Sequence, residues 1–383
     1  MSLCENCSSL EFGSSNMRLI YLPKYGDMLQ RFSQGCEGCR FFCDVIFFNA
    51  DIPQRPALYP SAETSIHLSP VWRRAYCMTL TINDPVSEVR SESKIFLRNE
   101  TSFSAGLRVN RNPKDDACFG HIQNWLRKCV RHGCRKVEGR RLPTRLIEVP
   151  SNQSAHPRLC HTDDKEIGQY LALSHCWGKT CMTRLLSKNE SKWGKCIDVS
   201  LLSKNFQDAL EITRRLGFKY IWIDALCILQ DSVEDWARES PKMANVYNNA
   251  VLVLSAMSAT NSEAGILNDR PALCSPPLGV GKTHYFLDAK YLVGEYGNGR
   301  ESPLSVLTNL PLNKRGWAAQ ERIMAARILH YTTYEMIWEC THSCQFESNH
   351  VLDSSHALDA SSSELVFNKG ITVLTLEVHG LSV

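Results

Sequence analysis

The sequence predicts an α/β fold in which a parallel sheet is flanked by helices and preceded by a cysteine-rich amino-terminal region of mixed structure. From Tyr170 onward, short apolar runs alternate with amphipathic segments, which is the pattern of strands connected by helices. Capping residues stand at the ends of the amphipathic segments. Five cysteines within the first 43 residues mark the amino-terminal region.

Length and charge limit the class of protein. The chain of 383 residues is long enough for two or three domains, and its 43% apolar content is that of a folded protein. Its 43 basic and 40 acidic side chains nearly cancel, so no global field attracts nucleic acid or an anionic membrane. No apolar stretch approaches the ~20 residues of a membrane helix. Neither a membrane nor a nucleic-acid partner is expected.

Cysteine usage predicts the compartment. The first nine residues do not have the basic start and apolar core of a secretory signal. The 17 cysteines are therefore expected to be thiols or metal ligands in a reducing environment. The sequence predicts a cytoplasmic protein.

Four regions are expected along the chain. The first has short strands, because apolar residues alternate at positions such as Met78, Leu80 and Ile82. The second is a helical connector with apolar residues at helical spacing. The third is the α/β domain, and the fourth is a truncated or disordered tail rich in serine, alanine and aspartate. The predicted regions are residues 1–115, 116–165, 166–345 and 346–383.

The α/β domain begins with three short, apolar segments of the kind that form strands buried on both faces. Ser203 and Ser232 are predicted to cap the two intervening helices, Gly217 to end the first and Pro241 to kink the second. This alternation predicts parallel neighbouring strands whose carboxyl ends lie at one edge of the sheet. The predicted strands are residues 170–174, 219–224 and 250–255. A helix over 317–324 and a hairpin over 327–332 and 335–340 follow.

Polar and special residues gather where these three strands end, and ligands of open parallel sheets bind beyond the carboxyl ends of the strands. A carboxylate, an imidazole and hydroxyls meeting there suit a polar ligand or general acid–base chemistry. Each of two residues also has a purely structural interpretation. Asp224 would then be a helix or loop cap, and His175 a partly buried histidine whose hydrogen bonds are satisfied. The residues are Ser174, His175, Cys176, Trp177 and Gly178 after the first strand, Asp224 after the second and Ser255 after the third.

Three blocks resemble, in order and at family spacing, the signature of the fungal heterokaryon-incompatibility (HET) domain. Segments around Trp125, Cys129 and 143–146, and the Trp338-Glu-Cys340 segment, resemble the usual flanks of that domain. Ala318 and Ala319 depart from the threonine and leucine usual there. The three blocks are 170–178 (YLALSHCWG), 220–230 (YIWIDALCILQ) with 235–243 (DWARESPKM) and Tyr247, and 315–322 (RGWAAQER). Residues 166–345 are thus expected to be a HET domain.

The resemblance implies a role in fungal non-self recognition, in which such domains trigger programmed death of incompatible fused cells. It also implies an architecture similar to TIR domains, some of which hydrolyse NAD with a glutamate. By this fold-level analogy, Glu321 is the first candidate for the catalytic carboxylate and Glu263 the second. Asp224 is expected to orient a ribose hydroxyl, with His175 at the rim of the site.

The same analogy assigns NAD contacts to residues at the strand ends, which are Ser174, Trp177, Gly178 and Ser255. A non-enzymatic alternative is a signalling module that self-associates or docks on receptor or other incompatibility proteins. A third is a hydrolase with Cys176 as nucleophile and His175 as base. Adjacent strand residues point to opposite faces, which disfavours that pair.

The amino-terminal cysteines form two pairs, Cys4-x-x-Cys7 and Cys36-x-x-Cys39. This spacing lets thiolates on tight turns surround a tetrahedral zinc ion, and ordinary buried cysteines are the alternative. A structural zinc is expected because a segment of this length buries little core on its own. The four sulfur atoms should then lie together.

Overall fold

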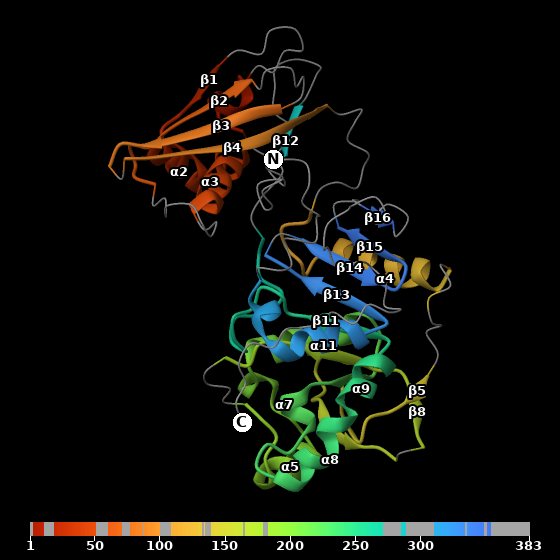
Figure 1. Cartoon of the computed structure of the whole chain (residues 1–383). Coiled ribbons are helices and arrows are strands. Elements are labelled where there is room, and N and C mark those ends of the chain that lie inside the picture. The colour runs from red at the N-terminus through yellow and green to blue at the C-terminus, as the bar shows by residue number, and fades with distance from the viewer. Residues whose placement is uncertain are drawn as a thin grey trace, which may run out of the picture. The chain divides into compact units, whose positions relative to one another are not determined.

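The computed structural model divides the chain into two compact units (Figure 1). We call them the amino-terminal unit (Met1–Asp115, Asn268–Leu310 and Thr333–Glu335) and the main unit (Asp116–Leu267, Pro311–Thr332 and Met336–Val383). The structure describes residues 3–10, 19–50, 60–70, 77–86, 88–99, 109–131, 134, 139–163, 165–178, 183–270, 285–288, 310–333, 335–347 and 351–353. Most of the predicted tail, 354–383, lies outside these residues.

The amino-terminal unit contains a five-stranded antiparallel sheet, as the alternating apolar residues predicted. Ile66 pairs with Ile82 and Leu68 with Leu80, so these four side chains share one face and are buried. They join one apolar core with residues of the two longer helices, including Phe41. The strand order is β1 (Ile20–Leu22), β2 (Ser65–Pro70), β3 (Cys77–Asp84), β4 (Val89–Asn99) and β12 (Tyr285–Asp288), and the helices are α1 (Glu5–Ser8), α2 (Tyr25–Ser33) and α3 (Glu37–Ala50).

The main unit is built on a nine-stranded sheet. Its centre confirms the prediction, because β9 lies between β10 and β11 and pairs with both in parallel. β13 adds a fourth parallel strand. The order is β16 (Val351–Asp353), β15 (Ser343–Phe346), β14 (Met336–Cys340), β13 (Arg327–Tyr331), β11 (Leu252–Ser255), β9 (Leu171–Ser174), β10 (Tyr220–Trp222), β6 (Arg145–Glu148) and β7 (Arg158–His161).

The sheet is mixed, so the prediction of a parallel sheet is correct only for its centre. β14, β15 and β16 follow β13 through short connections, and β6 and β7 form a hairpin against β10. Short connections permit only antiparallel pairing, whereas parallel neighbours need long crossovers. The predicted hairpin is confirmed as β13 and β14. A separate two-stranded sheet joins β5 (Arg140–Arg141) to β8 (Ile167–Gly168).

The four parallel strands contain a switch in their spatial order. They lie as β10, β9, β11 and β13, so the chain moves outward from β9 in both directions. Such a reversal opens a crevice at the carboxyl ends of the two strands where it occurs. Ser174 and Ser255 are register partners at the ends of β9 and β11. The crevice expected from the topology therefore lies beside these two serines.

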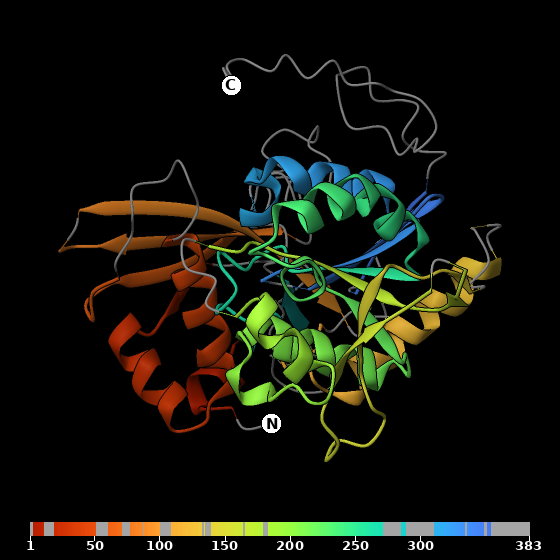
Figure 2. The ribbon, with the colours of Figure 1, turned by 90° about the horizontal axis from the view of Figure 1, so that it is seen from below.

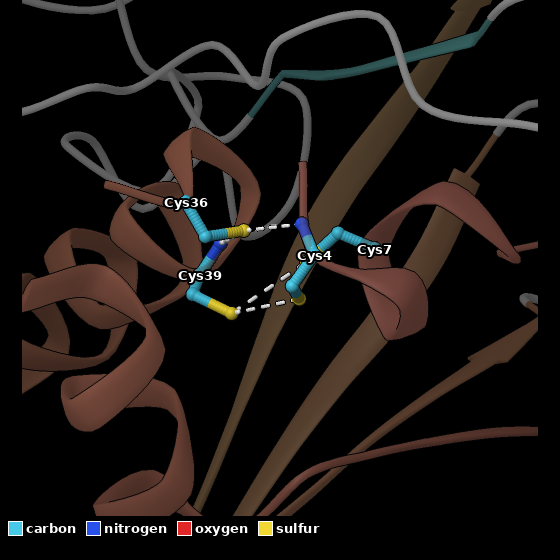
Figure 3. Close-up of side chains that lie close together, drawn as sticks. All are labelled: Cys4, Cys7, Cys36 and Cys39. Carbon is cyan, nitrogen blue, oxygen red and sulfur yellow. Dashed lines mark hydrogen bonds between the residues drawn. The ribbon is translucent and has the colours of Figure 1, made fainter. Parts of the chain in front are cut away.

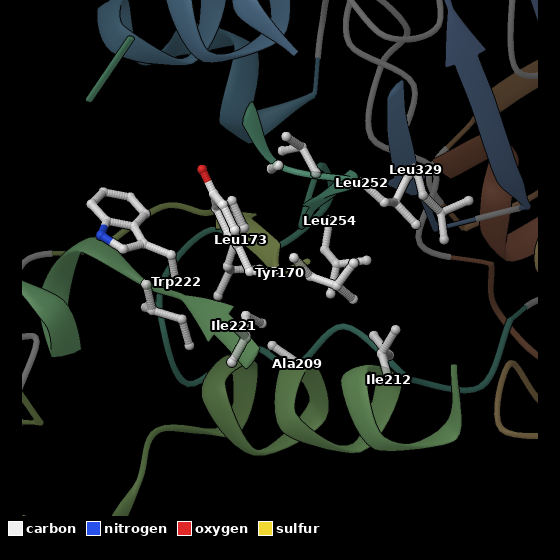
Figure 4. Close-up of a cluster of buried hydrophobic side chains, with 14 of the residues drawn as sticks. Tyr170, Leu173, Ala209, Ile212, Ile221, Trp222, Leu252, Leu254 and Leu329 are labelled. Atoms are coloured by element: carbon white, nitrogen blue, oxygen red, sulfur yellow. The ribbon is translucent and has the colours of Figure 1, made fainter. Parts of the chain in front are cut away.

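Helices cover both faces of this sheet (Figure 2). On one face, Ala209 and Ile212 of α6 (Lys204–Arg215) pack under strand residues such as Leu254 (Figure 4). The same face receives α4 (Asp116–Arg131), whose Trp125 ring lies 6.1 Å from that of Trp338. On the other face lie α9 (Met243–Asn249) and α11 (Gly316–Met324), which confirms the helix predicted over 317–324.

The predicted helix ends are mostly confirmed. The Ser232 side chain accepts a hydrogen bond from the Asp235 amide and caps α8 (Val233–Glu239). Pro241 lies in a 3₁₀ turn, η2 (Ser240–Lys242), that separates α8 from α9 and confirms the kink. Gly217 has φ +79° and ends α6. Ser203 is the N-cap residue of α6, as predicted, although its side chain makes no capping hydrogen bond.

Shorter elements connect these layers. They are α5 (Ser187–Trp193), η1 (Val199–Leu201), α7 (Asp224–Cys227) and η4 (Pro311–Lys314). None of the helices in the described part of the chain combines the length and apolar character needed to cross a bilayer.

Candidate functional site

Glu321 lies at the crevice between β9 and β11. Its helix, α11, presents it to the sheet, where Ser174 Oγ donates a hydrogen bond to Glu321 Oε2. The residue is 2% exposed, and its other carboxyl oxygen, Oε1, has no hydrogen-bond partner among the described residues. A buried carboxyl oxygen without a partner is costly, and a ligand or water molecule that donates a hydrogen bond to it would remove this cost.

A pocket of about 270 Å³ opens between η2–α9 and α11 beside this carboxyl group. Glu321 and Tyr247 are its two buried polar residues, and Trp317, which also lines it, is 61% exposed. Asp224 and His175 do not line it. The full lining is Ser240, Pro241, Met243, Ala244, Tyr247, Trp317, Gln320, Glu321 and Met324.

Burial raises the pKa of Glu321 from 4.5 to about 7, and the negative charge of Asp224 adds to this effect. The Ser174 hydroxyl and the Arg315 guanidinium act in the opposite direction. At neutral pH both protonation states of this carboxyl group are therefore populated. Such a group suits either proton transfer or stabilisation of a positive charge.

Asp224 begins α7 directly after β10 and is buried. Its Oδ1 accepts a hydrogen bond from the Ala225 amide at 2.7 Å, and its Oδ2 accepts one from Trp177 Nε1 at 2.9 Å. Arg315 NH2 lies 3.7 Å from Asp224 Oδ2. The carboxylate therefore holds the loop after β9 and the start of α11 together, beside Glu321 and outside the pocket lining.

His175 is buried, and not at the rim of the site. Its Nδ1 lies 3.8 Å from Asp224 Oδ1, too far for a hydrogen bond, and neither ring nitrogen has a hydrogen-bond partner within the described ranges. Burial lowers the pKa of His175 to about 4, so the ring is neutral at pH 7 and forms no ion pair. The ring stacks on Trp177 and meets Phe206 edge-on. Arg315 donates to the His175 carbonyl.

Cys176 does not form a nucleophile–base pair with His175. The ring nitrogens of His175 form no hydrogen bond with any group in the described part of the chain, the Cys176 thiol included. Burial raises the pKa of the half-buried Cys176 thiol, which keeps it protonated. This arrangement does not support the cysteine-hydrolase hypothesis.

Gly178 is required by the backbone of the loop after β9. Its φ is +79°, and a Cβ atom there would lie 2.5 Å from the Cβ of Asn261. Ser262 Oγ donates to the Trp177 carbonyl at 3.1 Å, which fixes this close approach. Glu263 is exposed on the same turn and does not line the pocket. Among the two candidate glutamates, Glu321 alone is in the buried cluster.

Ser255 belongs to a buried polar chain that the sequence did not reveal. Its hydroxyl lies 3.1 Å from His330 Nδ1, and His330 Nε2 lies 2.9 Å from Glu339 Oε2. Arg322 Nε donates to the same oxygen at 2.8 Å. His330 and Glu339 were missed because they lie within predicted strands, where only the register of β11, β13 and β14 brings them beside Ser255.

Tyr247 and Arg315 were also missed as site residues. Both stand in the signature blocks, at positions where the sequence offered no pattern beyond a helix face or a block boundary. Tyr247 lines the pocket, and Arg315 contacts Asp224 and the His175 carbonyl. Their presence in the signature blocks was the one indication in the sequence that they belong to the site.

The amino-terminal cysteine cluster, Cys4, Cys7, Cys36 and Cys39, confirms the predicted convergence (Figure 3). All four sulfur atoms lie within 4.8 Å of one another, and Cys39 Sγ is 3.6 Å from both Cys4 Sγ and Cys7 Sγ. Zinc–sulfur bonds of about 2.3 Å in a tetrahedron place the sulfur atoms about 3.8 Å apart. The cluster could therefore hold a metal ion.

Local backbone geometry brings these cysteines together. Cys4 is the N-cap residue of the single-turn helix α1 and Cys7 lies within it, while Cys36 directly precedes α3 and Cys39 lies in its first turn. A Cβ atom on Gly38 would lie 2.7 Å from Cys7 Sγ, so this approach requires glycine. The backbone amides of Cys4 and Cys39 donate to Cys36 Sγ at 3.2 and 3.4 Å. Sulfur atoms that accept amide bonds are well suited to carry thiolate charge.

Comparison with known proteins gives the domain its family. The family model described as "Heterokaryon incompatibility protein (HET)" matches residues 170–321. Residues 170–321 are a HET domain. All eight residues proposed from the strand ends and the third block, from Ser174 to Glu321, lie inside this HET domain, and Glu321 is the last matched position.

One curated relative is the "Heterokaryon incompatibility protein 6, OR allele" of Neurospora crassa, 29% identical over 112 residues. The match covers 25% of this chain and 16% of the relative, so the similarity spans less than a fifth of that protein. No solved structure matches the chain significantly. The HET domain is thus the part of the chain whose relationship is shown.

Proposed function

We propose that this chain acts in fungal non-self recognition, where its HET domain triggers programmed cell death by hydrolysing NAD. The observation that carries the enzymatic part is Glu321, a buried glutamate with a partly unsatisfied carboxyl group that lines a pocket and contacts Ser174 at the end of β9. The incompatibility role rests on the family match over residues 170–321.

The strand order supports a TIR-like architecture for the HET domain. The four parallel strands lie in the spatial order β10, β9, β11, β13. Numbered along the chain, this order is 2-1-3-4, as in flavodoxin-like sheets, whose ligands bind where the order reverses. Glu321 contacts Ser174 at this place. Because one fold hosts many functions, the proposed NAD hydrolysis rests on the residues of the site.

In the proposed reaction, the bond between nicotinamide and ribose C1′ breaks and nicotinamide leaves with the bonding electrons. Water then adds its oxygen to C1′ and releases a proton. The ribose passes through an oxocarbenium-like state, which a nearby carboxylate stabilises. Glu321 is the proposed carboxylate.

Other residues are proposed to support this carboxylate. Ser174 orients it through the hydrogen bond to Oε2, and Asp224 and His175 position the loop after β9. Trp177 is half-exposed and Gly178 exposed, so this loop is proposed to receive the phosphates. Ser255, bonded to His330, supports the floor of the crevice.

Regulated expression in yeast tests the proposed function. Wild-type chain is expected to stop growth and deplete NAD, whereas Glu321→Gln and Asp224→Asn are expected to restore growth at equal soluble protein. The first removes the stabilising charge and the second weakens the Trp177 contact. Glu263→Gln is the matched control, because Glu263 is exposed and outside the pocket. Growth arrest that persists in both variants would exclude the crevice carboxylates.

A docking module is the second candidate, and exposed apolar side chains on α11 favour it. Trp317 and Ile323 are 61% and 60% exposed, so a partner that covered them would remove apolar surface from water. Self-association or docking on a receptor protein would use this surface. Arrest that survives Glu321→Gln but is lost in Ile323→Glu would support docking, because Ile323 does not line the pocket.

We also propose that the amino-terminal cysteine cluster holds a structural zinc ion. The Cys4→Ser/Cys7→Ser double variant is expected to lose about one equivalent of zinc per chain, measured by elemental mass spectrometry, because two of four ligands are gone. Cys43→Ser is the matched control, since Cys43 is buried on α3 outside the cluster. Equal zinc contents in the double variant and wild type would refute the proposal.

A further inference from the structure

A second group of cysteines lies in the main unit, on the sheet face opposite Glu321. Cys129 is on α4, Cys134 follows that helix, and Cys340 ends β14. Their three sulfur atoms lie within 4.8 Å of one another, and each residue is at most 4% exposed. We call them the α4–β14 cysteine cluster.

A nitrogen ligand lies beside these sulfur atoms. His342, in the turn between β14 and β15, places its Nδ1 3.2 Å from Cys134 Sγ. The imidazole is exposed, and the Thr341 hydroxyl lies 2.9 Å from the same nitrogen. Three thiolates and one imidazole form a common donor set of closed, structural zinc sites.

Charge around the cluster favours thiolates with a cation. The buried Arg327 donates from Nε to Cys129 Sγ at 3.2 Å. The guanidinium beside Cys129 Sγ favours a thiolate over a neutral thiol at this position, and three thiolates, one Zn²⁺ and this guanidinium sum to zero charge. A hydrogen bond from a residue beyond the ligands is also the usual support of a metal-bound thiolate.

We propose that Cys129, Cys134, Cys340 and His342 bind a second structural zinc ion. The ion fastens the end of α4 to the β14–β15 turn. It would thereby bind the segment before the HET domain match to the strands after it. A disulfide would use only two of the three thiols and leave the third unpaired, so it explains the cluster less well.

Zinc content of the purified, reduced full chain tests this site separately from the amino-terminal one. The Cys4→Ser/Cys7→Ser variant is expected to retain about one equivalent, and Cys129→Ser/Cys340→Ser to lose about one relative to wild type. Cys118→Ser and Cys344→Ser are matched controls, because these buried cysteines lie on α4 and β15 outside the cluster. Both controls are expected to keep the wild-type zinc content.

Two outcomes would overturn the site even if a cysteine variant fails to fold. One is a metal-free Cys4→Ser/Cys7→Ser chain, and the other is a disulfide among the three cysteines in protein purified without reductant.

Cobalt loaded into the Cys4→Ser/Cys7→Ser chain is expected to show tetrahedral thiolate absorption. His342→Ala should release zinc to a chelator at least about tenfold faster, and an unchanged rate would overturn the histidine assignment.

Discussion

Replacing Glu321 by glutamine is expected to lower the rate of nicotinamide release from NAD by about 10²–10⁴-fold, because the amide cannot stabilise a positive ribose. The change keeps the shape of the side chain and its contact with Ser174 Oγ. Purified full chain at high concentration is incubated with NAD, and the products are separated. Release at the wild-type rate from the variant would contradict the proposed role of Glu321.

The pH dependence provides an independent check. Because the carboxylate is the active form and the pKa of Glu321 is about 7, the rate should rise as pH rises through that value. Stability should move the other way. Folding raises the pKa of this carboxyl group from 4.5 to about 7. Its contribution to the free energy of unfolding is therefore fully present below pH 4.5 and is lost as pH rises through about 7.

The glutamine of Glu321→Gln does not titrate, so the variant does not lose stability as pH rises. Its thermal stability therefore distinguishes loss of catalysis from loss of the fold. Above pH 7 the variant is expected to unfold at a higher temperature than wild type, as measured by thermal melting. An inactive variant that is also less stable at pH 8 would indicate structural damage. Growth arrest by a wild-type chain that releases no nicotinamide from NAD would contradict the proposed NAD hydrolysis.

The sequence predicted the centre of the fold because its signals are local. Short apolar runs alternate there with capped helices, and this alternation is typical of a parallel sheet. The runs are Leu171–Ser174, Tyr220–Trp222 and Leu252–Ser255. The sequence did not predict that antiparallel outer strands make the sheet mixed. Their pairing depends on the edge of the central sheet beside which each of them packs. That choice follows from packing across the whole unit.

The site was predicted in part for the same reason. Chain order places Ser174, Asp224 and Ser255 at one edge, but it does not say which side chains become buried. His175 is enclosed by Trp177 and Phe206, and Phe206 comes from a different helix. His330 and Glu339 reach Ser255 through register alone. These facts depend on tertiary contacts that no local pattern encodes.

The two cysteine clusters show the same limit. Cys4, Cys7, Cys36 and Cys39 form close pairs, and the spacing within each pair predicted their convergence. Cys340 is far along the chain from Cys129 and Cys134, so spacing offered no signal. Only the packing of α4 against β14 brings the three sulfur atoms together.

Changing Asp235 to asparagine is expected to lower the free energy of unfolding by about 3 kcal/mol, the low end of the cost of breaking a buried ion pair, because Arg145 NH1 keeps a longer contact with Glu190 Oε1 at 3.4 Å. Asp235 and Arg145 are 2% and 3% exposed, and Arg145 donates to Asp235 Oδ2. The Leu229 amide donates to the same oxygen at 2.8 Å. The pair therefore joins β6 to α8, and urea unfolding followed by tryptophan fluorescence measures the loss.

Arg238→Met is the matched control, because Arg238 donates to the other oxygen of Asp235 while its side chain is 57% exposed. Water replaces an exposed partner at little cost, so this change should lower stability by at most about 1 kcal/mol. The Ser232 cap uses the Asp235 amide and persists in both variants. Equal losses in the two variants would show that burial of Arg145 does not decide the stability of this pair.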